Sequence, residues 1–154
     1  MQNKYKVPQD VRETVIRLVK GYERRKRKIA EREREIIALD GARFETLGSE
    51  RVYTPSGKGG TSSPTEIKAM RLAKLHESFD FRCVQAIDEA LAALPIRHYP
   101  PELAAKIRQT IIISCAIGKK FKFSYSGIVG IEARYFYALR SMFIHTVAKK
   151  LDFI

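Results

Sequence analysis

Apolar side chains recur at every third or fourth residue along most of this chain, and this spacing predicts amphipathic α-helices. The first stretch follows Pro8, and Asp10 is a suitable N-cap for a helix that begins there. Gly21 lies inside the stretch and weakens a helix by roughly 1 kcal/mol relative to Ala. Its steps alternate between four and three residues, as in a heptad seam: Val11, Val15, Leu18, Tyr22, Arg25, Ile29, Arg32, Ile36 and Leu39. We therefore expect a long N-terminal helix that pairs either within the chain or with a second copy.

A break in this pattern divides the chain. Asp40-Gly41 is a typical helix end, and residues 46–63 are rich in Gly, Ser and Pro, which indicates a flexible linker. Ser63-Pro64-Thr65-Glu66 then has the form of a capping box. We expect residues 1–45 to form a helical arm, 46–63 the linker and 64–154 a helical domain. The overall prediction is an all-α fold with a central helical scaffold.

The end of the chain has the outline of a helix-turn-helix. A helix from Pro101 carries a wide apolar stripe around residues 111–113, which predicts burial on more than one side, and Gly118 ends this helix. Residues 123–151 then read as a short helix, a turn at Gly130 and a longer amphipathic helix. On a helical wheel the longer helix has an apolar side that contains Tyr135, Phe136, Leu139, Met142, Phe143 and Thr146. The opposite side is short, polar and cationic, as entry into a DNA groove requires.

Charge adds a candidate partner. The chain has 29 Lys and Arg against 17 Asp and Glu, a net charge of +12. Residues 1–35 and 102–154 each have a net charge of +6, whereas residues 36–101 are neutral. Two basic ends favour a polyanion such as nucleic acid. A basic helical protein without such a partner fits the same count.

The residues of the C-terminal motif resemble the helix-turn-helix of repressors and of the promoter-reading part of sigma factors. Ser126 is the small residue of the first helix, Gly130 is the turn glycine four positions later, and the apolar positions are Tyr125, Val129, Ile131, Phe136 and Leu139. A Ser or Thr N-cap is common before such recognition helices, but this chain has Gly130-Ile131-Glu132 there. The chain from about residue 102 to the end is also similar to phage late-gene transcriptional activators of the RinA/ArpU type. In that family a basic helical N-terminal part precedes a sigma-like helix-turn-helix.

The resemblance implies a DNA-binding transcriptional regulator, specifically a phage or prophage activator, in the cytoplasm of a bacterial host cell. Double-stranded DNA is the expected partner, and RNA polymerase is a candidate second one. By the same resemblance the base-facing residues are Glu132, Ala133, Arg134, Tyr137, Ala138 and Ser141. The basic side chains near this motif and in the N-terminal block are candidate phosphate contacts: Lys119, Lys120, Lys122, Arg140, Arg24, Arg25, Arg27 and Lys28.

Other functions have less support. The N-terminal seam makes residues 11–39 a candidate homodimer surface, and the alternative function is a helical interaction or assembly protein. The basic block around Arg25 is most simply a solvated helix face, and RNA binding through it is a third hypothesis.

The three histidines lack the spacing of a metal site, and no nucleophile motif is present, so we expect neither an enzyme nor a cofactor. Cys83 and Cys115 lie in apolar helical patterns, as buried thiols do. No apolar run is long enough to span a membrane.

Overall fold

The computed structural model describes residues 4–38 and 63–154, and its regular elements in these ranges are all helices, so the predicted all-α class is confirmed. The predicted linker lies outside these ranges except for Ser63, and so do Leu39, Asp40 and Gly41. In the described ranges, six α-helices and two 3₁₀ turns follow one another: α1 (Gln9–Lys20), α2 (Tyr22–Ile37), α3 (Pro64–Glu77), α4 (Phe79–Ala92), α5 (Pro101–Ile117), η2 (Gly118–Lys120), η3 (Phe123–Tyr125) and α6 (Ala133–Lys150).

The predicted N-terminal helix is present as two consecutive helices. Gly21 ends α1, and its N–H contacts the carbonyls of Arg17 and Leu18. Helix α1 begins two residues earlier than expected, so Pro8 rather than Asp10 is the N-cap. Proline cannot supply a side-chain cap. In the first turns of α1, Thr14 Oγ1 donates a hydrogen bond to the Asp10 carbonyl at 2.9 Å.

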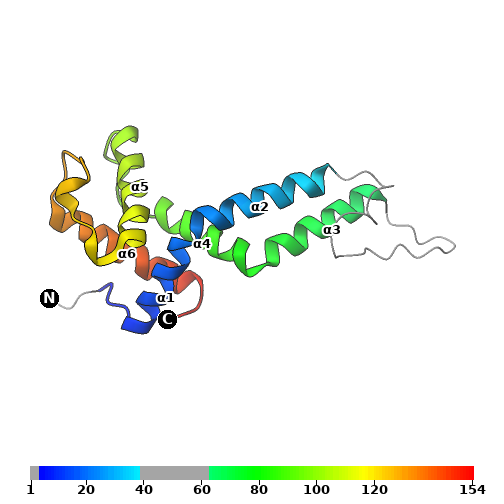
Figure 1. The fold of residues 1–154 in the computed structure, drawn as a ribbon, viewed down its shortest axis with the longest axis horizontal. Coiled ribbons are helices and arrows are strands. Elements are labelled where there is room, and N and C mark those ends of the chain that lie inside the picture. Colours follow the sequence, from blue (N-terminus) through cyan, green and yellow to red (C-terminus); the bar gives the residue numbers. More distant parts are fainter. Residues whose placement is uncertain (1–3, 39–62) are drawn as a thin grey trace. The chain divides into compact units, whose positions relative to one another are not determined.

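The chain divides into two compact units, and each division falls inside a helix. The first unit contains the chain up to Glu23 and from Cys83 onward, and the second contains Arg24–Arg82. In the first unit α1 packs against both α5 and α6 (Figure 1). The predicted neutral scaffold is therefore shared: residues 64–82 belong to one unit, and residues 83–101 belong to the other.

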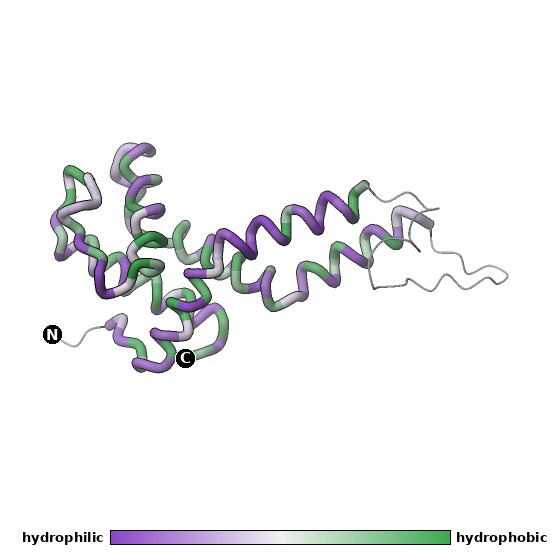
Figure 2. The backbone as a smooth tube through the Cα atoms, viewed as in Figure 1, coloured by the Kyte–Doolittle hydropathy of each residue, from purple (hydrophilic) through white to green (hydrophobic). Residues whose placement is uncertain are grey.

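Apolar side chains from α1, α4, α5 and α6 fill the core of the first unit. Figure 2 shows that hydrophobic positions alternate with hydrophilic ones along these helices. The largest fully buried side chains are aromatic or β-branched, with one leucine: Val15, Val19, Ile87, Ile96, Ile107, Ile111, Phe136, Leu139, Phe143, Ile144 and Val147. Two core thiols, Cys83 and Cys115, are buried as the sequence predicted. Tyr22 closes the edge of this unit by donating a hydrogen bond to Asp88.

The second unit pairs α2 with α3. Ile29, Ile36 and Ile67 are buried there, and His76 Nε2 lies 3.4 Å from Glu33 Oε1. The predicted capping box at the start of α3 is confirmed, because Ser63 Oγ accepts from the Glu66 N–H at 3.2 Å and Glu66 Oε2 accepts from the Ser63 N–H at 3.3 Å.

The heptad seam is thus buried within the chain. Val15, Leu18 and Tyr22 are buried in the first unit, and Ile29 and Ile36 are buried in the second. In this structure the seam pairs within one chain, which is one of the two ways of pairing that the sequence left open. A homodimer through residues 11–39 would have to give up these contacts.

Helix α5 does not have the wide burial that its isoleucines predicted. Ile111 is fully buried, Ile112 is half-buried and Ile113 is 43% exposed. The expectation of burial on more than one side is therefore wrong, because successive side chains on a helix point about 100° apart and only one face of α5 is covered.

We predict that the Phe136 ring supports the first unit. Phe136 is fully buried, so Phe136→Ala removes an aromatic side chain from a closed site and should lower the free energy of unfolding by about 3–5 kcal/mol. Tyr125→Ala is the matched control, since that ring is 82% exposed, and its effect should stay within about 0.5 kcal/mol. Urea unfolding followed by circular dichroism measures both. Equal losses for the two variants would contradict this packing.

Candidate nucleic-acid interface

The two halves of α6 have different surroundings. Side chains on several faces of its second half are buried, among them Phe143, Ile144, Val147 and Ala148. Ile144 and Ala148 lie about 140° or more from Leu139 on the helical wheel, so the wheel did not predict their burial. In the first half only Phe136 and Leu139 are buried. The first half of α6 is therefore the part of this helix that offers a free face.

The predicted base-facing residues share this free face. Glu132, Ala133, Arg134, Tyr137 and Ala138 are exposed, and Ser141 is half-buried. Tyr137 keeps 39% of its surface exposed, while the edge of its ring packs against Phe136 at a centroid distance of 5.6 Å. Arg134 forms no ion pair with any residue in the described ranges. The face thus consists of two alanines, one free guanidinium, one phenol ring and one carboxylate at the helix start.

Helix α6 begins without a side-chain cap. Glu132 is the N-cap residue with an extended ψ of 149°, and its side chain makes no capping hydrogen bond. The missing cap agrees with the sequence, which has Gly130-Ile131-Glu132 where recognition helices commonly have a Ser or Thr N-cap. The first N–H groups of an uncapped, exposed helix start carry a partial positive charge, which favours a nearby anion such as phosphate.

The connection before α6 is more elaborate than the sequence predicted. Residues 123–125 form a single 3₁₀ turn rather than an α-helix, so α5 is the α-helix that precedes α6. Gly130 has a φ of 101°, as expected for the turn glycine, but Gly118 and Gly127 also have positive φ values of 73° and 72°. The predicted first helix of the helix-turn-helix is therefore absent, and α5 and α6 are joined by residues 118–132, a much longer connection than the usual turn of three or four residues.

Aromatic packing explains this conformation. The rings of Phe121 and Phe123 lie 5.7 Å and 5.0 Å from the ring of Phe136, measured between centroids. Two aromatic anchors two residues apart hold the chain against α6 in a path that an α-helix would not follow. In the sequence, Phe121 and Phe123 are interleaved with Lys120 and Lys122, and this pattern did not predict their packing against α6.

The lysines of this connection are all exposed. Lys119 and Lys120 belong to η2, and Lys122 follows them. The ammonium of Lys122 lies 5.9 Å from the centroid of the Tyr125 ring, within the range of a cation–π contact. No carboxylate in the described part of the chain forms an ion pair with these three lysines. They are placed to meet negative charge from outside the protein.

Arg140 is a different case from the other predicted phosphate contacts. Its side chain is half-buried, and its Nε is enclosed without a hydrogen-bond partner among the described residues. The guanidinium interacts with Cys115, where it partly opposes the rise that burial causes in the pKa of the thiol. Arg140 is therefore less accessible to phosphate than the exposed lysines, because part of its side chain faces the core.

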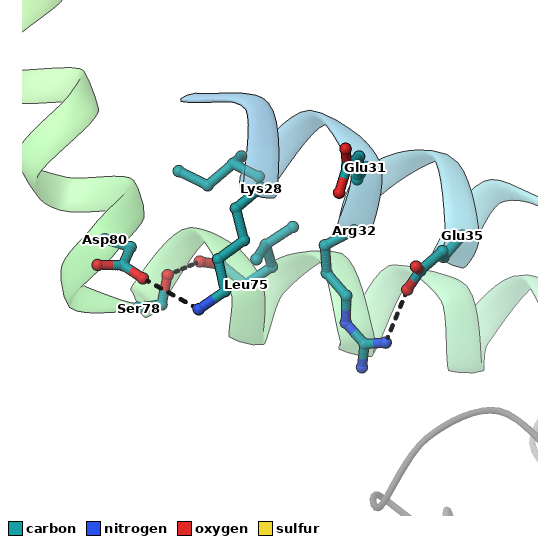
Figure 3. Close-up of a pocket in the computed structure, with 8 residues that line it drawn as sticks. Lys28, Glu31, Arg32, Glu35, Leu75, Ser78 and Asp80 are labelled. Carbon is teal, nitrogen blue, oxygen red and sulfur yellow. Dashed lines mark hydrogen bonds and ion pairs between the residues drawn. The ribbon is translucent and has the colours of Figure 1, made fainter. Parts of the chain in front are cut away.

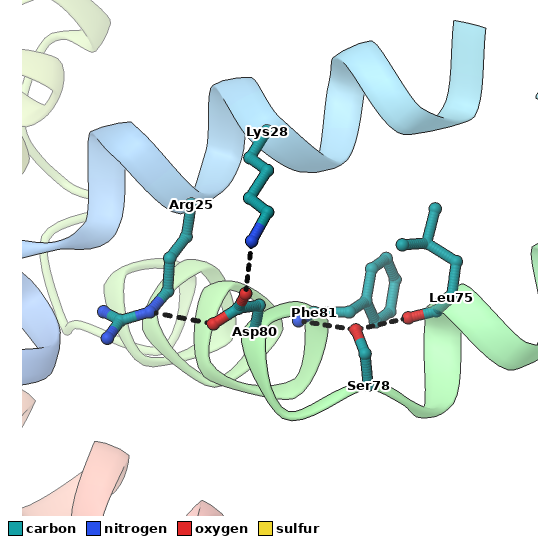
Figure 4. Close-up of polar contacts among 6 residues, drawn as sticks. All are labelled: Arg25, Lys28, Leu75, Ser78, Asp80 and Phe81. Atoms are coloured by element: carbon teal, nitrogen blue, oxygen red, sulfur yellow. Dashed lines mark hydrogen bonds and ion pairs between the residues drawn. The ribbon is translucent and has the colours of Figure 1, made fainter. Parts of the chain in front are cut away.

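The N-terminal basic block is likewise divided. Arg25 Nε lies 3.2 Å from Asp80 Oδ1, and only 16% of its side chain is exposed (Figure 4). This internal pairing corrects the prediction of a phosphate contact at Arg25. Lys28 reaches Asp80 Oδ2 at 3.8 Å but stays 76% exposed, while Arg24 and Arg27 are exposed.

A recess of about 390 Å³ lies beside this pairing, between α2 and α3. Figure 3 shows its charged lining, in which Arg32 pairs with Glu35 at 3.3 Å and Lys28 pairs with Asp80. Glu31 adds a further carboxylate. Cations and carboxylates alternate here, so the recess offers no net positive field for a polyanion.

The sequence missed the exposure of two apolar residues. Tyr125 and Val129 occupy apolar positions of the motif that the resemblance gave, but they are 82% and 83% exposed. The nearby glycines at 127 and 130 were the available signal, because positive φ values at both reverse the chain and turn neighbouring side chains outward.

Two absences hold for the described ranges. Residues 4–38 and 63–154 contain no group of three or more His, Cys, Asp or Glu side chains that could hold a metal ion. Within the same ranges, none of the helices combines the length and apolar character needed to cross a membrane.

Comparison with known proteins adds no family assignment. The chain matches no protein-family model, no curated protein and no solved structure.

Chemical modification should separate the exposed arginines from the enclosed ones. We expect phenylglyoxal to react with Arg134 before Arg140 and with Arg24 and Arg27 before Arg25, because the reagent needs an accessible guanidinium. Mass spectrometry of peptides from the briefly treated native protein gives the order. The urea-unfolded protein is the control, in which all five should react alike. Early reaction at Arg140 or Arg25 would contradict the burial described above.

Proposed function

We propose that this protein binds duplex DNA through the first half of α6 and acts as a transcriptional regulator, an activator of a phage or prophage in the cytoplasm of a bacterial host. One observation carries the proposal. A fixed helix exposes a face with small residues and a free guanidinium, directly after a segment with three unpaired lysines.

The size and chemistry of this face suit the major groove. Ala133 and Ala138 leave room for the helix to approach base edges, and recognition helices use their N-terminal residues for this purpose. The Arg134 guanidinium matches the two acceptors of guanine, O6 and N7. The Tyr137 hydroxyl can donate to a phosphate, and its ring can touch a thymine methyl group.

Phosphate contacts come from the connection before α6. Lys119, Lys120 and Lys122 would neutralise backbone charge and hold the helix in register, without reading sequence. Arg24, Arg27 and Lys28 remain candidates for a second contact made by the other unit. Arg25 and Arg140 are not proposed, since both guanidinium groups are engaged within the protein.

The class of regulator rests on the resemblance to late-gene activators and to sigma factors. Under this proposal α6 selects the promoter, and RNA polymerase is the candidate second partner. A helical assembly protein is the alternative function. Its proposed surface, the seam of residues 11–39, is largely buried in the chain, which lowers its support relative to DNA binding.

Selection of bound fragments from random duplex DNA tests the function directly. One enriched motif would support a sequence-specific regulator. Uniform recovery of fragments would contradict it and leave only a basic protein.

We predict that Arg134 and Tyr137 determine much of the affinity for the selected duplex. Arg134→Ala should weaken binding by about 5- to 150-fold and relax the preference at one base position, as expected when a bidentate guanine contact is lost. Tyr137→Ala should also weaken binding. Fluorescence anisotropy with labelled duplex at one fixed salt concentration measures both.

Arg17→Ala is the charge-matched control for Arg134→Ala, because Arg17 is an exposed arginine on α1. It removes the same charge and should change affinity far less. If Arg134→Ala and Tyr137→Ala bind like the original protein with the same sequence preference, the groove assignment fails.

We predict that the three lysines account for most of the salt dependence. Three phosphate contacts, made by these lysines, should lower affinity by roughly one and a half decades between about 50 and 200 mM salt. Replacing all three lysines with Gln should reduce the slope of log affinity against log salt by about 2.7, with equal effects on all DNA sequences. An unchanged slope would place the phosphate contacts elsewhere.

A further inference from the structure

Two side chains before α6 are exposed far beyond what their chemistry favours. Tyr125 and Val129 are 82% and 83% exposed, whereas the next most exposed large apolar side chains in the described ranges, Met70 and Ile37, reach 67% and 63%. Both lie in the loop of residues 122–130, which joins the lysine-rich segment to the turn before α6. We call this segment the 122–130 loop.

The backbone of the 122–130 loop is held in place at residues 126–128. Ile128 is buried, and its N–H donates to Ser126 Oγ at 3.2 Å. Lys106 of α5 donates from Nζ to the Gly127 carbonyl at 3.0 Å. The loop therefore presents Tyr125 and Val129 from a fixed frame, and a partner would bind them with little loss of conformational entropy.

The charge around the loop indicates what such a partner offers. The Lys122 ammonium lies 5.9 Å from the centroid of the Tyr125 ring, and Lys119 and Lys120 are exposed nearby in sequence. A fitting surface has apolar groups next to negative charge. The minor groove of duplex DNA is such a surface, because sugar C–H groups and base edges lie between two rows of phosphates.

We propose that the 122–130 loop enters the minor groove next to the major groove that α6 occupies, an inference that rests on the proposed function. Tyr125 and Val129 contact sugars and base edges, and Lys122 binds a phosphate at the wall of the groove. Apolar side chains that press into a minor groove widen it and bend the duplex away from them. The loop therefore adds affinity on flanking base pairs that α6 does not reach.

The experiment uses the full chain and two duplexes that carry the selected site, one with flanking base pairs and one trimmed to the site. Tyr125→Ala and Val129→Ser should each weaken binding to the flanked duplex by about tenfold, as the loss of one buried apolar contact predicts. Both variants should bind the trimmed duplex like the original protein. The control Ile154→Ser removes an apolar side chain that is 49% exposed and should change neither affinity.

Two further readouts separate apolar contact from charge. Energy transfer between dyes at the two ends of the flanked duplex should report a smaller bend with Tyr125→Ala. The salt slope should stay unchanged for Tyr125→Ala and fall by about 0.9 for Lys122→Gln. Circular dichroism of each variant checks that the fold is kept.

The outcomes distinguish this inference from the proposed function. If the original protein binds neither duplex, both fail together. If it binds both but the loop variants match it on the flanked duplex, only the minor-groove inference is overturned. Vesicles of an anionic phospholipid form a third arm, and binding to them that Tyr125→Ala abolishes, with DNA affinity unchanged, would assign the loop to a membrane surface instead.

Discussion

The burial of Phe136 is the contact on which the candidate interface depends. Its ring is fully buried, and the rings of Phe121 and Phe123 pack on it from the preceding segment. Because Phe136 and Leu139 must face inward, the rotation of α6 about its axis is fixed, and Arg134 and Ala138 must face outward. The same contact holds the connection against α6, so that Lys119, Lys120 and Lys122 lie in a segment whose path is set by aromatic packing. One hydrophobic cluster thus orients both the face that would read bases and the segment that would hold phosphates.

The cations of this chain differ in what surrounds them, and this difference decides their availability. Arg25 faces Asp80, and Arg140 lies against the Cys115 thiol, so both guanidinium groups serve the protein itself. A buried guanidinium without a carboxylate partner would be costly, because the charge would lose its hydration without compensation, and Asp80 supplies that compensation for Arg25. Arg134 and the lysines of the connection stay in solvent. The net charge located the two basic regions of the chain. Because Arg25 and Arg140 are engaged within the protein, fewer cations are available to a polyanion than the composition suggests.

The 122–130 loop and α6 offer complementary chemistry. Helix α6 presents a polar and cationic face, whereas the loop presents Tyr125 and Val129 beside a lysine. The loop is held by Ile128 and by the hydrogen bond from Lys106 to Gly127, which links it to α5. An interaction through the N-terminal seam has no comparable exposed surface, since most of its apolar residues are buried within the units.

The sequence by itself determined the helical class, the capping box at Ser63, the turn at Gly130 and the inward side of the first half of α6. These features depend on residues three or four positions apart or on single glycines and caps, and such local rules can be read along the chain. Only the tertiary structure decided that the heptad seam is satisfied within the chain, that Arg25 and Arg140 are engaged, and that the second half of α6 is covered on several sides. It also turned Tyr125 and Val129 outward, against their apolar character. The reason is physical: burial and charge pairing depend on which side chains from distant segments meet, and a periodic pattern contains no information on the partner.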